Sequence, residues 1–225
     1  MTSPQSITKP AQRDVKLARH ASAREAIGTL EKGRDVYVLS FGQFSLLDAI
    51  GAILDQTGPA DVSVATWTAS APHVEELAYT LNAMPGVHSF RLIVDRSLKE
   101  RNSETYDRMV AVFGIDAIRT VYKTHAKFAL IRNERFDVVV RTSMNLNHNA
   151  RLEDLEVSED RAFAEFFQRL IDGIFRENPP GLCACTPSTF ESVQDSFSDF
   201  PLVQSSVLPQ ENLHEPQATH TLARS

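Results

Sequence analysis

Residues 36–68 read VYVLSFGQFSLLDAIGAILDQTGPADVSVATWT and contain the pattern that decides the fold. Val36–Phe41 and Val62–Thr68 are apolar runs of strand length with several β-branched residues, which predicts two buried strands. Between them, apolar residues recur at helical spacing from Phe44 to Leu54, and the pair Gly58-Pro59 then supplies a turn. The stretch is therefore predicted to form a strand, a helix and a second strand.

The same alternation continues toward the C-terminus. An apolar stripe from Val74 to Met84 predicts a helix, and Phe90–Val94 predicts a third strand. A charged stretch over 97–102 then leads into a helix that ends at Gly114, and Ile118–Tyr122 predicts a further strand. Strands and helices in alternation are typical of a parallel sheet that is covered by helices.

Two segments vary this pattern. Upstream, apolar residues from Val15 to Leu30 recur at roughly helical spacing, and Gly33 follows where a helix end often needs a positive φ, so a helix is predicted. Downstream, His125–Arg132 and Phe136–Thr142 are extended runs separated by three residues, which indicates a hairpin. The expected fold class is α/β, with a mostly parallel or mixed sheet and helices on both faces.

The C-terminal third predicts the limits of the domain. Leu152–Val157 reads as a strand, and Asp160 caps a helix whose apolar face runs from Phe163 to Phe175. Beyond Pro179-Pro180 no periodicity remains, and the Ser, Thr, Gln and Pro content is typical of disorder. We therefore expect a flexible lead-in over 1–12, one α/β domain over 13–177 and a disordered acidic tail over 178–225.

Composition restricts the class of protein. With 42% hydrophobic and 23% charged residues in 225, the chain has the balance of an ordinary globular protein with one main domain. The net charge of −6 excludes a surface that is basic throughout. No segment approaches the roughly 20 apolar residues that span a bilayer, and the N-terminus has no apolar stretch of signal-peptide length. A cytoplasmic protein without stable membrane association is expected.

The two cysteines give little support to a disulfide or a metal site. Cys183 and Cys185 are separated by one residue, too close for an ordinary structural disulfide, so they imply no oxidising compartment. A zinc site would need further ligands such as His214 and His220, and Cys-x-Cys matches no common zinc spacing. We expect no metal and no cofactor.

The segment from Ile118 to Arg151 is locally basic although the chain is acidic. Four of its cations are candidates for binding phosphate or nucleic acid, and a solvated surface explains them equally well. These candidates are Lys123, Arg132, Arg141 and Arg151. Trp67 lies at the end of an apolar strand, where parallel sheets place ligand crevices, but packing in the core is the favoured interpretation.

The residues that carry chemistry lie between positions 125 and 156. His125 and Lys127 are two apart, so on a strand both side chains emerge on one face, and Ser143 and Asn145 share a face likewise. A neutral imidazole is a workable nucleophile, while Lys, Ser and Asn donate hydrogen bonds to phosphate oxygens as charge develops. A carboxylate such as Glu156 can orient a histidine ring.

This segment resembles the phospholipase D superfamily, whose members carry His-x-Lys on one strand, Gly-Ser-x-Asn on the next and then an acidic residue. The resemblance covers roughly residues 13–177 and implies the same fold. It implies that His125 forms a phospho-histidine, that a second histidine protonates the leaving oxygen and that Glu156 orients a ring. The chain has one His-x-Lys, so a symmetric homodimer would supply the second copy of His125. His148 is the other histidine near the motif.

Two departures from the family pattern leave two functions open. Arg132 stands where the family usually has Asp, and Thr142 replaces the Gly of Gly-Ser-x-Asn, where it could crowd the approach of a phosphate. The leading hypothesis is a metal-independent phosphodiesterase, most simply a homodimeric nuclease acting on DNA or RNA. The alternative is a catalytically degenerate relative that binds nucleic acid or a protein partner without turnover. A lipid-directed phospholipase is disfavoured because no amphipathic membrane-surface segment is evident.

Overall fold

One mixed sheet forms the frame of the protein. The computed structural model describes residues 12–83, 87–146 and 150–181, and within them eight strands form a sheet in the order β1-β2-β8-β7-β6-β3-β4-β5. The pairs β1–β2, β3–β4 and β4–β5 are parallel, and the other four pairs are antiparallel. The strands are β1 (Gln12–Ala18), β2 (Arg34–Ser40), β3 (Ala60–Thr66), β4 (Val87–Asp95), β5 (Ile118–Val121), β6 (Phe128–Arg132), β7 (Asp137–Thr142) and β8 (Glu153–Glu159).

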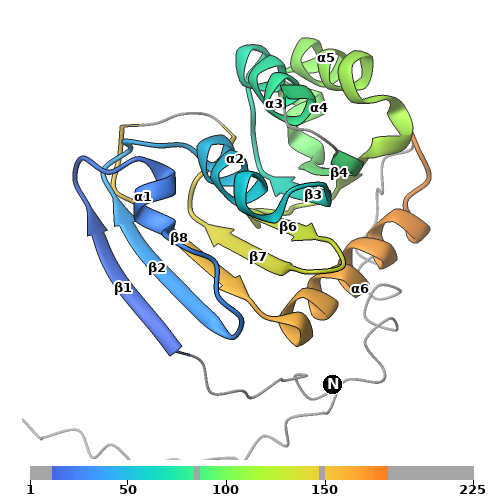
Figure 1. Ribbon diagram of the computed structural model, residues 1–225. Helices are drawn as coiled ribbons and strands as arrows, with labels where there is room; N and C mark the ends of the chain where they lie inside the picture. The colour runs from blue at the N-terminus through green and yellow to red at the C-terminus, as the bar shows by residue number, and fades with distance from the viewer. Residues whose placement is uncertain (1–11, 84–86, 147–149, 182–225) are drawn as a thin grey trace, which may run out of the picture.

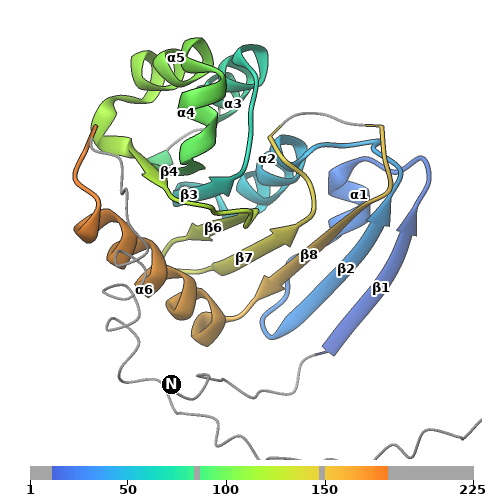
Figure 2. The same cartoon turned by 180° about the vertical axis from the view of Figure 1, so that it is seen from behind.

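Helices cover both faces of this sheet, as predicted (Figure 1). Five of them lie on one side, and the long C-terminal helix lies on the other, as the reverse view in Figure 2 also shows. The five are α1 (Ala23–Ile27), α2 (Leu46–Thr57), α3 (Ala71–Ala83), α4 (Arg96–Arg101) and α5 (Ser103–Phe113), and the sixth is α6 (Arg161–Glu177). A short 3-10 turn, η1 (Ile115–Ala117), precedes β5.

Successive side chains along the central strands point to opposite faces of the sheet, and this produces two hydrophobic layers. Ala129 and Ile131 of β6 face the larger layer with α2, whereas Phe128 and Leu130 face the smaller layer beneath α6. All four side chains are at most 5% exposed. Strand β6 is therefore buried on both faces, which explains why its sequence is a continuous apolar run.

The predicted hairpin is confirmed as β6 and β7. Phe128 is opposite Arg141 and Arg132 is opposite Asp137 in an antiparallel ladder. The side-chain oxygen of Asn133 accepts hydrogen bonds from the backbone N–H groups of Arg135 and Phe136, both at 2.9 Å, and so closes the turn.

The predicted N-terminal helix is wrong. Residues 12–18 form the edge strand β1, which pairs in parallel with β2, and only Ala23–Ile27 is helical. Charged and apolar residues alternate over Asp14–Leu17, and this period of two is the signal that the apparent helical spacing obscured. The glycine that ends the helix is Gly28 and not Gly33, because its N–H donates to the carbonyl of Arg24 with φ at 74°.

Other boundaries shift in smaller ways. The charged stretch that was expected to lead into a helix is itself helical, since the side chain of Asp95 accepts the N–H of Ser97 and caps α4. The described chain continues past Glu177 through the buried Asn178 to Gly181. The predicted tail from residue 182, both cysteines, His148, His214 and His220 lie outside the described residues.

No helix among the described residues is long and apolar enough to cross a membrane.

The packing of α6 can be tested with Phe167, which is 8% exposed and makes edge contacts with Phe128, Phe163 and Phe166. Phe167→Ala should lower the free energy of unfolding by about 3–5 kcal/mol, because it leaves a cavity under the helix. The exposed Leu152 serves as the control, since Leu152→Ala should change the free energy of unfolding by less than about 0.5 kcal/mol. Urea denaturation of both variants measures the difference, and equal midpoints would contradict the packing described.

Candidate functional site

His125 and Lys127 lie in the connection that leads into β6. The strand begins only at Phe128, so the expectation that both residues are on the strand itself is wrong by a few positions. The segment is nevertheless extended at its end, because the carbonyl of Lys127 accepts the N–H of Thr142 at 3.3 Å. This bond continues the β6–β7 pairing and brings the two motif segments together.

The side chains of His125 and Lys127 contact each other directly. The Lys127 ammonium nitrogen lies 3.1 Å from Nδ1 and 3.3 Å from Nε2 of the imidazole, and it donates to the His125 carbonyl at 2.8 Å. The other neighbour of the imidazole is Trp67, with the two ring centroids 5.2 Å apart. His125 itself is exposed, so its ring is accessible to a substrate.

The ammonium group of Lys127 is held in a partly buried position. Burial lowers the pKa of Lys127, and the nearby carboxylate of Glu153 opposes this effect only in part. A desolvated ammonium group binds a phosphate oxygen more strongly than an exposed one, because less water competes for it. The Lys127 ammonium is therefore well placed to donate a hydrogen bond to a phosphate oxygen.

Ser143 and Asn145 follow β7 on the next segment. The Ser143 hydroxyl donates to Glu153 and accepts the N–H of Asp154 at 3.0 Å. The side-chain oxygen of Asn145 is buried and has no hydrogen-bond partner among the described residues. Thr142, in the position of the family glycine, donates its hydroxyl to the carbonyl of Asp154 at 2.5 Å, so this group supports the β7–β8 connection.

A cavity of ≈ 620 Å³ joins most of these residues. Its apolar wall comes from α6, and its polar wall comes from the ends of β6, β7 and β8. The lining residues are His125, Ala126, Lys127, Phe128, Arg141, Thr142, Ser143, Asp154, Glu156, Phe166, Phe167 and Leu170. Four of the five predicted catalytic residues thus lie around one cavity, and Asn145 is absent from its lining.

Glu156 pairs with two arginines and not with His125 of the same chain. Its carboxylate accepts a hydrogen bond from Arg13 at 2.8 Å and forms a second ion pair with Arg141. Arg141 is directly opposite Glu156 in the β7–β8 ladder, so both side chains emerge on the same face. The side chain of Glu156 is only 10% exposed, and two guanidinium groups compensate for its burial.

The four predicted phosphate-binding cations are not gathered in one place. Arg141 lines the cavity, but Arg132 lies at the far end of β6, paired with Asp137 at 2.6 Å, which corrects its expected place in the site. Lys123 is an exposed turn residue with φ at 55°, and its ammonium lies over the Tyr122 ring. Arg151 is exposed and does not line the cavity.

The sequence patterns did not place two further residues, Glu153 and Trp67, beside the motif residues. Glu153 lies at the start of β8, accepts a hydrogen bond from Ser143 and acts electrostatically on Lys127, whose pKa its carboxylate raises against the effect of burial. Trp67 was assigned to the core, but it is half-buried at the carboxyl end of β3 and contacts His125. The position of Trp67 just after a strand was the available signal.

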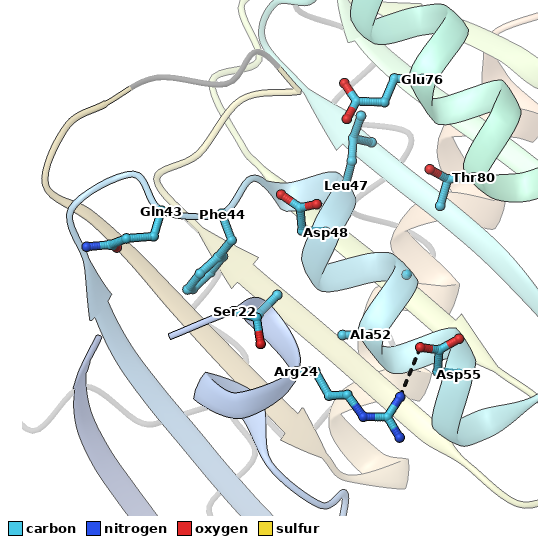
Figure 3. Close-up of a pocket in the computed structure, with 12 residues that line it drawn as sticks. Ser22, Arg24, Gln43, Phe44, Leu47, Asp48, Ala52, Asp55, Glu76 and Thr80 are labelled. Carbon is cyan, nitrogen blue, oxygen red and sulfur yellow. Dashed lines mark hydrogen bonds and ion pairs between the residues drawn. The ribbon is translucent and has the colours of Figure 1, made fainter. Parts of the chain in front are cut away.

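A second hollow of ≈ 410 Å³ lies between α1, α2 and α3 (Figure 3). Asp48, Asp55 and Glu76 line it, and Arg24 is already paired with Asp55 at 3.0 Å. This lining carries more negative charge than that of the His125 cavity, where Lys127 and Arg141 balance Asp154 and Glu156, so the second hollow is less suited to a phosphate.

No protein-family model and no curated protein sequence matches the chain. Among solved structures it is similar to Nuc from Salmonella typhimurium, a phospholipase D family member, with 11% identity and a TM-score of 0.48 over 65% of this chain and 98% of that one. It is also similar to NucT from Helicobacter pylori, with 12% identity and a TM-score of 0.44 over 65% and 99% of the two chains. A third similarity is to polyphosphate kinase from Porphyromonas gingivalis, with 17% identity and a TM-score of 0.43 over 62% and 26%.

The lowered pKa of Lys127 can be measured by competitive acetylation. Burial disfavours the ammonium form, so the amine should deprotonate, and therefore react, at lower pH than the amine of Nα-acetyllysine amide. Mass spectrometry of the peptide that contains Lys127 gives its labelling at each pH. A half-maximal labelling pH at or above that of the reference amine would contradict the burial described here.

Proposed function

We propose that this protein is a metal-independent phosphodiesterase of the phospholipase D type, most simply a homodimeric nuclease that cleaves DNA or RNA. The observation that carries the proposal is the contact between Lys127 and both ring nitrogens of His125, at the rim of a cavity that Ser143 also lines. The candidate nucleophile, the Lys127 ammonium and the Ser143 hydroxyl thus line the same cavity. The cytoplasm is the expected location of this activity.

The proposed reaction has two steps. A ring nitrogen of His125 attacks phosphorus, the bond to the leaving oxygen breaks, and a second histidine gives that oxygen its proton. Water then attacks the phospho-histidine, gives a proton to the second histidine and releases His125. Lys127 donates to the non-bridging oxygens, where negative charge increases in the transition state, and Ser143 does so once its hydroxyl turns from Glu153 toward the phosphate.

The second histidine is proposed to be His125 of another copy of the chain. A two-fold axis beside the exposed His125 would place the two equivalent rings on opposite sides of one phosphate. Each subunit would then supply the acid for its partner's nucleophile.

A binding protein without turnover is the second candidate, and the ion pairs of Glu156 favour it. With Arg13 and Arg141 as partners, this carboxylate is not available to orient the imidazole in the described structure. A degenerate relative would bind nucleic acid in a salt-sensitive way but would not cleave it.

The nucleophile can be tested by substitution. His125→Ala should reduce cleavage of single-stranded DNA or RNA in EDTA by at least about 1,000-fold, because no other group replaces the attacking nitrogen. His88→Ala is a matched control, since His88 is an exposed histidine at the start of β4 and does not line the His125 cavity. Unchanged cleavage by the His125 variant would remove His125 from the mechanism, and binding without cleavage by the unmodified protein would favour the second candidate.

The requirement for two subunits can be tested by mixing. If each active centre needs His125 from both copies, only dimers of two unmodified subunits are active. After subunit exchange with His125→Ala protein, activity should then be proportional to the square of the fraction of unmodified protein. Independent monomers would instead give a linear decrease. Analytical ultracentrifugation of the same samples shows whether dimers are present.

A further inference from the structure

His125 also contacts a cation–aromatic stack that is not part of the cavity lining. The ring of Trp67 lies 5.2 Å from the imidazole, and the guanidinium carbon of Arg101 lies 4.7 Å from the centroid of the same Trp67 ring. One aromatic ring therefore separates an arginine from the candidate nucleophile.

Arg101 is held in this place by the end of α4. Its Nε donates to the carbonyl of Ser97 at 3.1 Å, and its Nη2 donates to the Ser97 hydroxyl at 3.0 Å. Ser97 is fixed in turn because its N–H donates at 2.9 Å to Asp95, a buried residue that is 4% exposed. A guanidinium group has five N–H donors, so several remain available to a ligand.

The charge of Arg101 is not neutralised by a carboxylate, in contrast to the charges of two other arginines near the site. Arg13 and Arg141 share the carboxylate of Glu156. Across residues 12–83, 87–146 and 150–181, no carboxylate forms an ion pair with Arg101, and its side chain is exposed. An exposed arginine with a fixed plane and no counter-charge is suited to bind a phosphate through two N–H groups.

We infer that Arg101, supported by Trp67, is a second phosphate subsite that binds the phosphate next to the one attacked by His125. This inference rests on the proposed function and specifies its substrate class. A polynucleotide carries a further phosphate one nucleotide away along the strand, whereas an isolated phosphodiester or a phospholipid with one phosphate has no group to offer Arg101. The preferred substrate is then a polynucleotide.

The test compares two substrates in EDTA. Bis(p-nitrophenyl) phosphate has one phosphate, and an oligothymidylate of ten nucleotides has neighbouring phosphates. Arg101→Gln should lower kcat/KM for the oligonucleotide by about tenfold or more, chiefly through KM, and leave kcat/KM for the small diester unchanged. Arg101→Lys should restore part of the loss, and Arg108→Gln should have no effect, because Arg108 is paired with Glu75 on α3. Equal losses on both substrates, or no loss on either, would overturn the subsite.

A binding experiment keeps the subsite separate from the chemistry. In the His125→Asn background, affinity for the same oligonucleotide should fall with Arg101→Gln, and the slope of log affinity against log salt concentration should become shallower by about 0.7. If the unmodified protein cleaves neither substrate but this change is seen, the proposed function fails and the subsite stands. If affinity and slope stay the same, the subsite is wrong whether or not the protein is an enzyme.

Discussion

The antiparallel pairing of β6 with β3 is the constraint on which the rest of the structure depends. It joins the parallel unit β3-β4-β5 to the strands β7, β8, β2 and β1, so that eight strands become one sheet. Its register places Phe128 opposite Ala65, and therefore brings the segment before β6 to the carboxyl end of β3. His125 meets Trp67 for this reason, although 58 positions of sequence separate them.

The fold could be predicted where periodicity and turn residues agreed. The central strands, α2, α3, α6 and the β6–β7 hairpin have strong apolar patterns with clear boundaries, and each was found close to its expected place. The N-terminal strand could not be identified, because Val15, Ala18 and Ala21 recur at a spacing of three, which is close to the helical period, and because β1 depends on its pairing with β2. Helix α4 was hidden because its charged sequence has a single buried residue, Leu98, to indicate a packed face.

The site was predictable in its residue types but not in its contacts. His125, Lys127 and Ser143, which the sequence motif singles out, lie beside one cavity. The partners of Glu156 are Arg141, which lies opposite it in β7, and Arg13, which lies on β1 beyond β2, and this arrangement of strands is a tertiary property. Arg132 shows the same limit, since only the length of β6 reveals that a residue five positions after Lys127 lies at the far end of the strand.

The proposed chemistry requires that His125, Lys127 and Ser143 surround one phosphate position. A crystal structure of the protein with orthovanadate, an analogue of phosphate in its transition state, tests this claim directly. We expect the vanadium atom within bonding distance of a ring nitrogen of His125, with its oxygens hydrogen-bonded to the Lys127 ammonium and the Ser143 hydroxyl. Vanadate bound only to Arg13 and Arg141, or bound away from His125 altogether, would contradict the account.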